Sequence, residues 1–73
     1  MIEGCYRMFG MKVQQTREML GLTQLELSKR VGLTRTSVVN IEAGRQRILM
    51  HHVEKFAAAF QIAPKVLLRG IWT

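Results

Sequence analysis

Two short helices are predicted by the stretch Gly21–Arg45, which reads GLTQLELSKRVGLTRTSVVNIEAGR. Thr23 and Glu26 have the T-x-x-E spacing of a capping box, in which each side chain accepts a hydrogen bond from the other residue's backbone N–H. Gly32 then stands where a left-handed residue commonly ends a helix. Together these signals predict a helix over Thr23–Val31.

A second start signal follows after a very short turn. Thr34 stands at a cap position, and Leu33 and Val38 have the spacing of a hydrophobic staple around it. Gly44 is the next residue suited to a left-handed cap. We therefore expect a helix over Thr34–Ala43, and two helices joined by so short a turn have the spacing of a helix-turn-helix.

The rest of the chain adds helical patterns and no strand-like alternation. Helices are expected from Met11 to Leu20, over Leu49–Phe60 and from Pro64 to Gly70. The second of these places Leu49, Val53, Phe56, Ala57 and Phe60 on one apolar stripe. The residues Met1–Gly10, interrupted by two glycines, are left open as loop, strand or partner contact. We expect an all-α fold of five short helices, with an N-terminal extension over 1–10 and a domain over 11–73.

Composition indicates one small, basic globular domain. Hydrophobic residues are 48% of the 73 residues, and eleven Lys and Arg against five Glu give a net charge of +6. A sequence pI of about 10.5 is in the range of nucleic-acid-binding domains. No apolar run reaches the roughly 18 residues that cross a bilayer, and no secretion signal is recognised at the N-terminus. Cys5 is the only cysteine, which excludes an internal disulfide and favours a reducing cytoplasm.

One face of the Thr34–Ala43 helix has side chains suited to reading DNA bases. Helical spacing places Arg35, Thr36, Val39, Asn40 and Ala43 together, opposite Val38 and Ile41. Arginine binds guanine O6 and N7, asparagine binds adenine N6 and N7, and apolar groups contact the thymine methyl. The alternative is an ordinary polar surface helix with two incidental apolar residues.

The distribution of charge favours the DNA-binding reading. Between positions 29 and 47 there is one anion, Glu42, and five cations: Lys29, Arg30, Arg35, Arg45 and Arg47. Cations that neutralise phosphates release counterions from duplex DNA, and helix N-termini add unpaired N–H groups for the same oxygens. Gln24, directly after the first cap, can also reach a backbone oxygen.

The stretch Gly21–Arg45, with its LTQ-x-EL opening, its turn glycine and its I-E-x-G exit, resembles the helix-turn-helix of the phage repressor and Cro (XRE-type) regulators. The resemblance covers about Met11 to Gly70 and implies a five-helix domain whose third helix lies in the major groove. It implies base contacts from Arg35, Thr36, Val39 and Asn40, and phosphate contacts from Gln24, Ser37, Arg45, Gln46 and Arg47. It also implies a structural ion pair between Arg17 and Glu42, for which the alternative is a weak surface pair worth about 0–1 kcal/mol.

Two residues depart from the family pattern. Ser28 stands where the family usually has alanine at the helix crossing, so its hydroxyl needs a hydrogen-bond partner. Leu25 stands at a position that is usually polar, which leaves an apolar group that the solvent can reach.

The sequence gives no support for catalysis, a metal or a cofactor. His51 and His52 are adjacent and so point in different directions on a helix, which suits surface or cap positions better than chelation. Cys5 has no neighbour in the sequence that would activate its thiol, and neither Ser28 nor Ser37 has a base arranged beside it. We expect a protein that is not an enzyme and that binds no cofactor and no metal.

The expected partner is double-stranded DNA, bound by a homodimer on a two-fold operator, because one recognition helix contacts only about three or four bases. Without an effector domain, such a regulator would repress by occupying a promoter, in the cytoplasm on the nucleoid; contact with polymerase is a further option. The expected dimer interface comprises Val66, Leu67, Ile71 and Trp72, unless Trp72 folds back over its own chain. The alternative function is an antitoxin or other interaction module that neutralises a protein partner and binds DNA secondarily.

Overall fold

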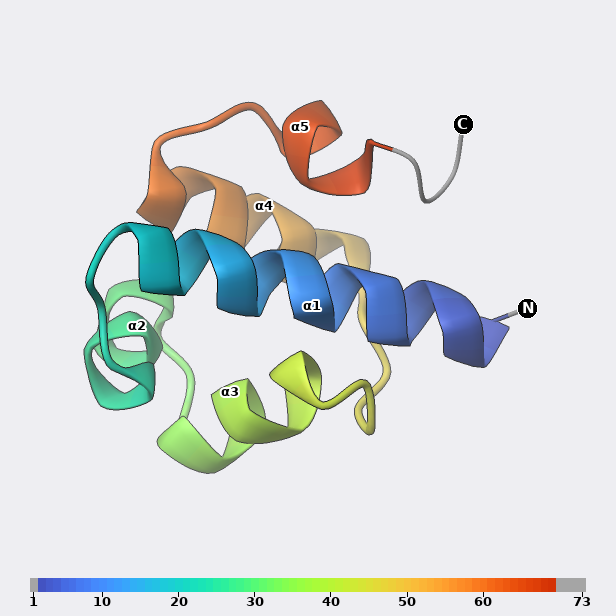
Figure 1. Cartoon of the computed structure of the whole chain (residues 1–73), viewed down its shortest axis with the longest axis horizontal. Coiled ribbons are helices and arrows are strands. Elements are labelled where there is room, and N and C mark those ends of the chain that lie inside the picture. Colours follow the sequence, from blue (N-terminus) through green and yellow to red (C-terminus); the bar gives the residue numbers. More distant parts are fainter. Residues whose placement is uncertain (1, 70–73) are drawn as a thin grey trace.

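The computed structural model describes residues 2–69, with side chains described from Gly4 onward. These residues fold into five helices joined by short loops. They are α1 (Ile2–Met19), α2 (Gln24–Val31), α3 (Arg35–Glu42), α4 (Met50–Phe60) and α5 (Pro64–Leu68). The long α1 lies across the molecule, with α3 on one side of it and α5 on the other (Figure 1). Residues 2–69 contain no strand, and the predicted all-α fold is confirmed.

The core lies where α1 and α4 meet the helix-turn-helix. Phe9 of α1 and Phe56 of α4 pack edge to face, with ring centroids 6.1 Å apart, and both side chains are fully buried. Leu27 of α2 and Val38 and Ile41 of α3 complete the same cluster. Each large apolar side chain buried in this way contributes about 1.5–3 kcal/mol, so this core fixes α3 against the other helices.

The capping signals are formed as the sequence predicts. Thr23 Oγ1 accepts a hydrogen bond from the Glu26 N–H at 3.0 Å, and a Glu26 carboxylate oxygen accepts one from the Thr23 N–H at 2.8 Å. Thr34 Oγ1 caps α3 by accepting from the Ser37 N–H at 3.1 Å. Gly32 has the left-handed conformation (φ +71°) that ends α2 before the turn.

The first helix begins at Ile2 instead of Met11, so residues 2–10, left open as loop, strand or partner contact, are helical. Phe9 is fully buried, and Gly10 lies where α1 crosses the end of α3. An added Cβ on Gly10 would be 2.2 Å from the carbonyl oxygen of Ile41. The glycine that suggested an interruption is therefore what lets the two helix backbones approach.

The apolar pattern predicts Leu49 on the buried stripe of the fourth helix, and this prediction is wrong. Leu49 is the N-cap residue of α4 and is 47% exposed, while the preceding Ile48 is buried instead. The helix starts one residue later than the apolar pattern suggested, with His52 Nδ1 accepting a hydrogen bond from the Leu49 N–H at 3.1 Å. This histidine takes the place of the acidic residue in a capping box.

The prediction that Leu67 lies at a dimer interface is also wrong, because its side chain is 1% exposed in the core of the chain itself. Val66 is half-buried, and Ile71 and Trp72 lie outside the described residues. Lys12 Nζ fastens α5 to α1 by donating to the carbonyl oxygens of Val66 (3.1 Å) and Arg69 (3.2 Å). Within residues 2–69, no helix has the length and apolar character needed to cross a membrane.

Candidate nucleic-acid interface

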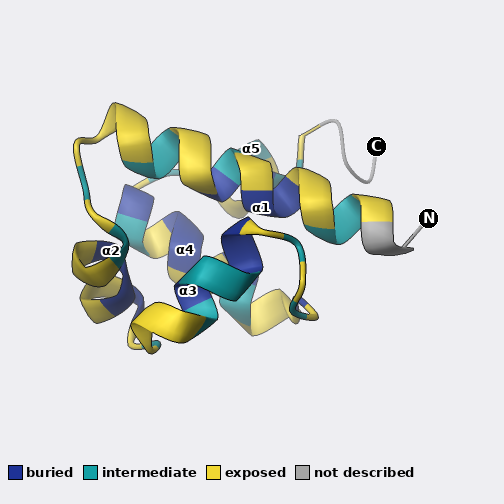
Figure 2. Cartoon of the chain, turned by 60° about the horizontal axis from the view of Figure 1, so that its bottom comes forward, coloured by how far each residue is buried: buried dark blue, intermediate teal, exposed yellow. Residues whose placement is uncertain are grey.

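The third helix has one face in the core and one face toward solvent, as the pattern predicts. Val38 and Ile41 are fully buried. On the other side Arg35 and Thr36 are exposed and Asn40 is half-buried (Figure 2). Val39 is also half-buried and Ala43 is exposed. The four side chains proposed to contact bases, together with Ala43, are therefore at least partly open to solvent.

An ion pair inside the protein holds the end of α3 in place. Arg17 of α1 donates from Nε to Glu42 Oε2 at 2.7 Å and from Nη2 to Glu42 Oε1 at 3.2 Å. The Arg17 and Glu42 side chains are only 11% and 4% exposed, so this is not a surface pair. Arg17 Nη1 also donates to the carbonyl oxygen of Leu22 at 2.8 Å. The hydrogen bond with Glu42 raises the pKa of Arg17 above its usual value.

The same carboxylate positions the first residue of α2. Gln24 Nε2 donates to Glu42 Oε1 at 3.0 Å, so the Gln24 side chain is held by the protein and its second amide N–H is left for another acceptor. The hydroxyl of Ser28 donates to the Leu25 carbonyl oxygen at 2.6 Å, which supplies the partner that this departure from the family pattern requires. Leu25 itself is exposed.

Exposed cations surround this face of α3. Lys29 and Arg30 lie in the last turn of α2, Arg35 begins α3, and Arg45 and Arg47 lie in the following loop, all exposed. Within residues 4–69 none of these five forms an ion pair with a carboxylate. Ser37 and Gln46, also predicted to contact phosphate, are half-buried beside them. The first turn of α3 has no acidic residue to offset the positive end of its dipole.

The two histidines lie at the start of α4. Their rings are 4.3 Å apart between centroids, and His52 is engaged in the cap of the helix. Burial lowers the pKa of His52, and the charges of His51 and Lys55 lower it further. No three metal-ligating side chains gather anywhere among the described residues.

The sequence model of the helix-turn-helix family matches residues 13–67. The chain belongs to this family, in its phage repressor and Cro (XRE) branch. A helix-turn-helix-type transcriptional regulator of Methanothermobacter thermautotrophicus is 41% identical over 46 residues, which are 59% of this chain and 67% of that protein. The helices α2 and α3 thus form the helix-turn-helix motif that defines this family.

Solved structures of bacterial regulators share the fold. The restriction-modification controller protein C.AhdI from Aeromonas hydrophila has a TM-score of 0.82 at 31% identity, covering 85% of this chain and 94% of that one. The hypothetical transcription factor NHTF from Neisseria has a TM-score of 0.82 at 33% identity, covering 86% and 72%. The clp gene regulator ClgR from C. glutamicum, with a TM-score of 0.83 at 17% identity over 88% and 83%, shows the fold alone.

These relationships place the helix-turn-helix protein among DNA-binding transcriptional regulators and outside the enzymes. Sequence reasoning missed one exposed basic residue beside the loop that follows α3, Arg7, because no structure was predicted for its segment. A signal was present: Tyr6, Phe9 and Val13 have helical spacing, and all three pack in the core cluster.

Proposed function

We propose that this regulator is a repressor that binds a two-fold operator as a homodimer, in the cytoplasm on the nucleoid. The observation that carries the proposal is the solvent-facing side of α3, where Arg35, Thr36 and Asn40 stand between exposed cations on both sides. In this proposal the bound homodimer represses by occupying a promoter.

In this proposal the side chains of α3 read the sequence. Arg35 binds guanine and Asn40 binds adenine, each through two hydrogen bonds, while Thr36 and Val39 contact neighbouring bases or a thymine methyl. The phosphate contacts, which set the register, come from Gln24, Ser37, Arg45, Gln46 and Arg47. Gln24 would use the amide N–H that Glu42 leaves free.

The experiment is selection of bound fragments from a random duplex pool, followed by affinity measurements on the selected site and on unrelated DNA. Arg35→Ala and Asn40→Ala should each cost about 1–3 kcal/mol on the selected site and little on unrelated DNA. Arg69→Ala, which removes an exposed arginine after α5, is the control and should change neither. Equal losses on both DNAs would show that α3 does not read bases, and selected sites without two-fold symmetry would exclude the proposed homodimer.

A second candidate function, an antitoxin-like module with a protein partner, is favoured by one surface. Met19 and Leu20 at the end of α1 are 85% and 52% exposed, and Leu25 of α2 is 49% exposed. In this second function a protein partner covers these exposed apolar side chains. Light scattering on the purified chain separates the two functions: a stable species that binds duplex DNA supports the regulator, and a chain that aggregates unless a second protein is supplied supports the module.

A further inference from the structure

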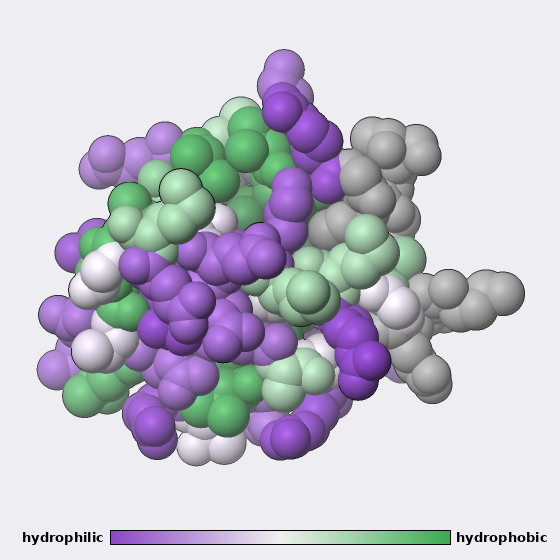
Figure 3. Space-filling view, viewed as in Figure 1, coloured by the Kyte–Doolittle hydropathy of each residue, from purple (hydrophilic) through white to green (hydrophobic). Residues whose placement is uncertain are grey.

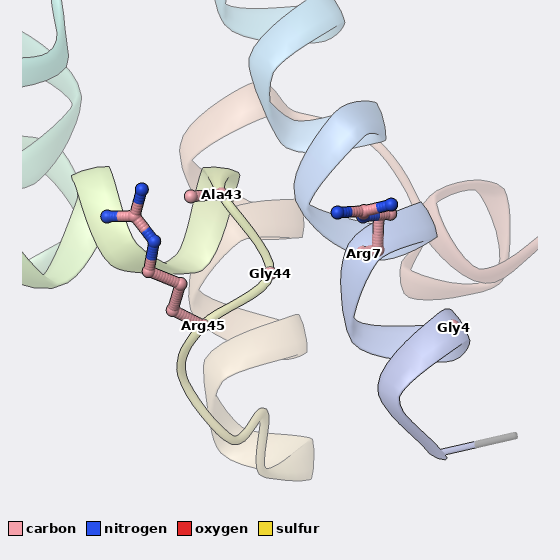
Figure 4. A pocket seen from close by; sticks show the side chains of 5 residues that line it. All are labelled: Gly4, Arg7, Ala43, Gly44 and Arg45. Carbon is pink, nitrogen blue, oxygen red and sulfur yellow. The ribbon is translucent and has the colours of Figure 1, made fainter.

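A basic cleft lies between the first turns of α1 and the loop that follows α3. It has a volume of about 590 Å³ and is lined by Gly4, Arg7, Ala43, Gly44 and Arg45. Figure 4 shows Arg7 projecting from α1 and Arg45 from the loop, with the backbone of Gly44 between them. Both arginines are exposed, and none of the residues from Gly4 to Arg69 that line the cleft carries a carboxylate.

The two walls of the cleft are held together by backbone contact. A Cβ added to Gly44 would be 2.8 Å from Cα of Arg7, so glycine is required there both for this approach and for its φ of +75°. One turn further along α1, Gly10 touches the carbonyl oxygens of Ile41 and Glu42 in the same way. Because α1 is fixed at both points, the backbone of Arg7 keeps a constant position relative to Arg45.

The cleft adjoins the α3 surface for which DNA binding is proposed. Arg45 follows the last turn of α3 and belongs to the basic loop that also contains Arg47. The cleft thus continues the row of exposed cations from the end of α3 onto α1. Two guanidinium groups beside exposed backbone are the chemistry that binds phosphodiester oxygens.

We propose that the sugar-phosphate backbone of the bound duplex passes along this cleft, where Arg7 binds a phosphate next to the one bound by Arg45. The inference rests on the DNA binding proposed above and extends it to a residue before the segment that the family model covers, residues 13–67. Arg7 adds affinity without sequence preference, because it contacts only phosphate.

The test measures affinity for the selected duplex against salt concentration for the wild type and four variants. Arg7→Ala should lower the slope of log affinity against log salt by about 0.9 per bound chain, the counterion release of one phosphate contact. Arg7→Lys, which keeps the charge, should restore the slope. Arg47→Ala gives the size of the effect from a loop cation, and Arg69→Ala, on the opposite side of α1, should leave the slope unchanged.

Phosphate ethylation interference supplies a second measurement. At least one phosphate in each half-site should block binding of the wild type when ethylated and have no further effect on Arg7→Ala. An unchanged slope and an unchanged interference pattern in Arg7→Ala would overturn the inference. Binding of inorganic phosphate, measured by NMR, gives a further outcome that would overturn it. If Arg7→Ala loses phosphate binding but binds DNA like the wild type, the cleft is a site for small anions and not for the DNA backbone.

The two proposals fail in different ways. If the wild type selects no duplex, or if Arg35→Ala loses no specificity, the proposed function fails. If the wild type binds its selected site with specificity that depends on Arg35 while Arg7→Ala behaves like Arg69→Ala, only the role of Arg7 fails.

Discussion

Glu42 accepts three hydrogen bonds at the point where three helices meet. Two come from Arg17 of α1 and one from Gln24 of α2, while Glu42 itself is the last residue of α3. A buried ion pair is weak grounds for stability as such, because taking both charges out of water is costly. Here the three hydrogen bonds fix the orientation of α3 relative to α1 and α2, and hence which of its side chains face solvent.

Removing one partner of the Arg17–Glu42 ion pair should lower the stability of the fold far more than replacing both partners by apolar residues. Glu42→Ala leaves the Arg17 guanidinium buried without its carboxylate, and we expect a loss of about 3–5 kcal/mol in the free energy of unfolding, measured by urea denaturation. The exposed Glu54→Ala is the control, expected within about 0.5 kcal/mol of the wild type. In the double variant Arg17→Met with Glu42→Leu much of the stability should return. A loss below about 1 kcal/mol in Glu42→Ala would contradict a structural role for the pair.

His52 makes the start of α4 sensitive to pH. Burial, with the charges of His51 and Lys55, holds the pKa of His52 below its ordinary value of 6.5, and Nδ1 must be unprotonated to accept from the Leu49 N–H. The unfolded chain binds the proton more readily, so this stabilisation is complete above pH 6.5 and is lost as the pH falls through the lower pKa of the folded state. Between about pH 7.5 and 5.5 the wild type should lose about 0.5–1 kcal/mol through this cap.

His52→Gln tests this expectation by thermal melting across that pH range. Glutamine keeps a capping side chain and does not titrate in the range, so the variant should lose much less stability on acidification than the wild type. The exposed neighbour variant His51→Gln should keep most of the pH dependence. If His52→Gln and the wild type respond alike to pH, the titrating group lies elsewhere.

At the scale of elements, the crossing of α1 over α3 decides how the recognition helix is supported. The two helices meet at Gly10, where the backbone of α1 touches the last carbonyl groups of α3. Phe9, beside it, fills the core against Phe56. The segment before Met11 is therefore part of the packing of the domain, and the helix it forms carries Arg7 to the end of α3.

Two glycines of α1 should respond in opposite ways to alanine. In Gly10→Ala the new methyl would meet the Ile41 and Glu42 carbonyl oxygens at 2.2 and 2.7 Å, and we expect destabilisation of at least about 1–3 kcal/mol. In Gly4→Ala the methyl meets nothing within 4 Å, so the better helix propensity of alanine should leave stability equal or up to about 1 kcal/mol higher. Urea denaturation of both variants is the measurement, and equal effects would contradict the close crossing.

The sequence predicted an element correctly where the residues that determine it lie close together in the chain. The capping box at Thr23, the left-handed Gly32 and the two faces of α3 all depend on residues within a turn or two of one another, and these predictions agree with the structure. Gly10 was read as an interruption because its reason, contact with α3, lies about thirty positions away in the chain. Leu67 was assigned to an interface because sequence alone does not show how much apolar surface one small core can cover. Arg7 was missed because taking Gly10 as an interruption left the segment before Met11 without a predicted helix.

At the scale of the whole molecule, the α3 surface and the α5 helix lie on different sides of α1 (Figure 1). The exposed cations lie around α3, and α5 lies across α1 from it (Figure 1). In the view of Figure 3, hydrophobic residues reach the surface along the edge formed by α4 and α5, while hydrophilic residues cover much of α1. A second copy that contacts Val66 of α5 would therefore leave the α3 surface open.

The single tryptophan offers a direct test of that arrangement. If Trp72 anchors a homodimer, its fluorescence emission should move to shorter wavelength over the same protein concentrations at which sedimentation shows monomers becoming dimers. Val66→Glu, which places a charge on α5 within the proposed interface, should shift both transitions to higher concentration, whereas the exposed Lys65→Glu should shift them less. Emission that is already at short wavelength in the monomer would mean that Trp72 folds back on its own chain. The proposed operator symmetry would then require a dimer surface elsewhere, because a closed two-fold pair must bring the same patch of both chains together.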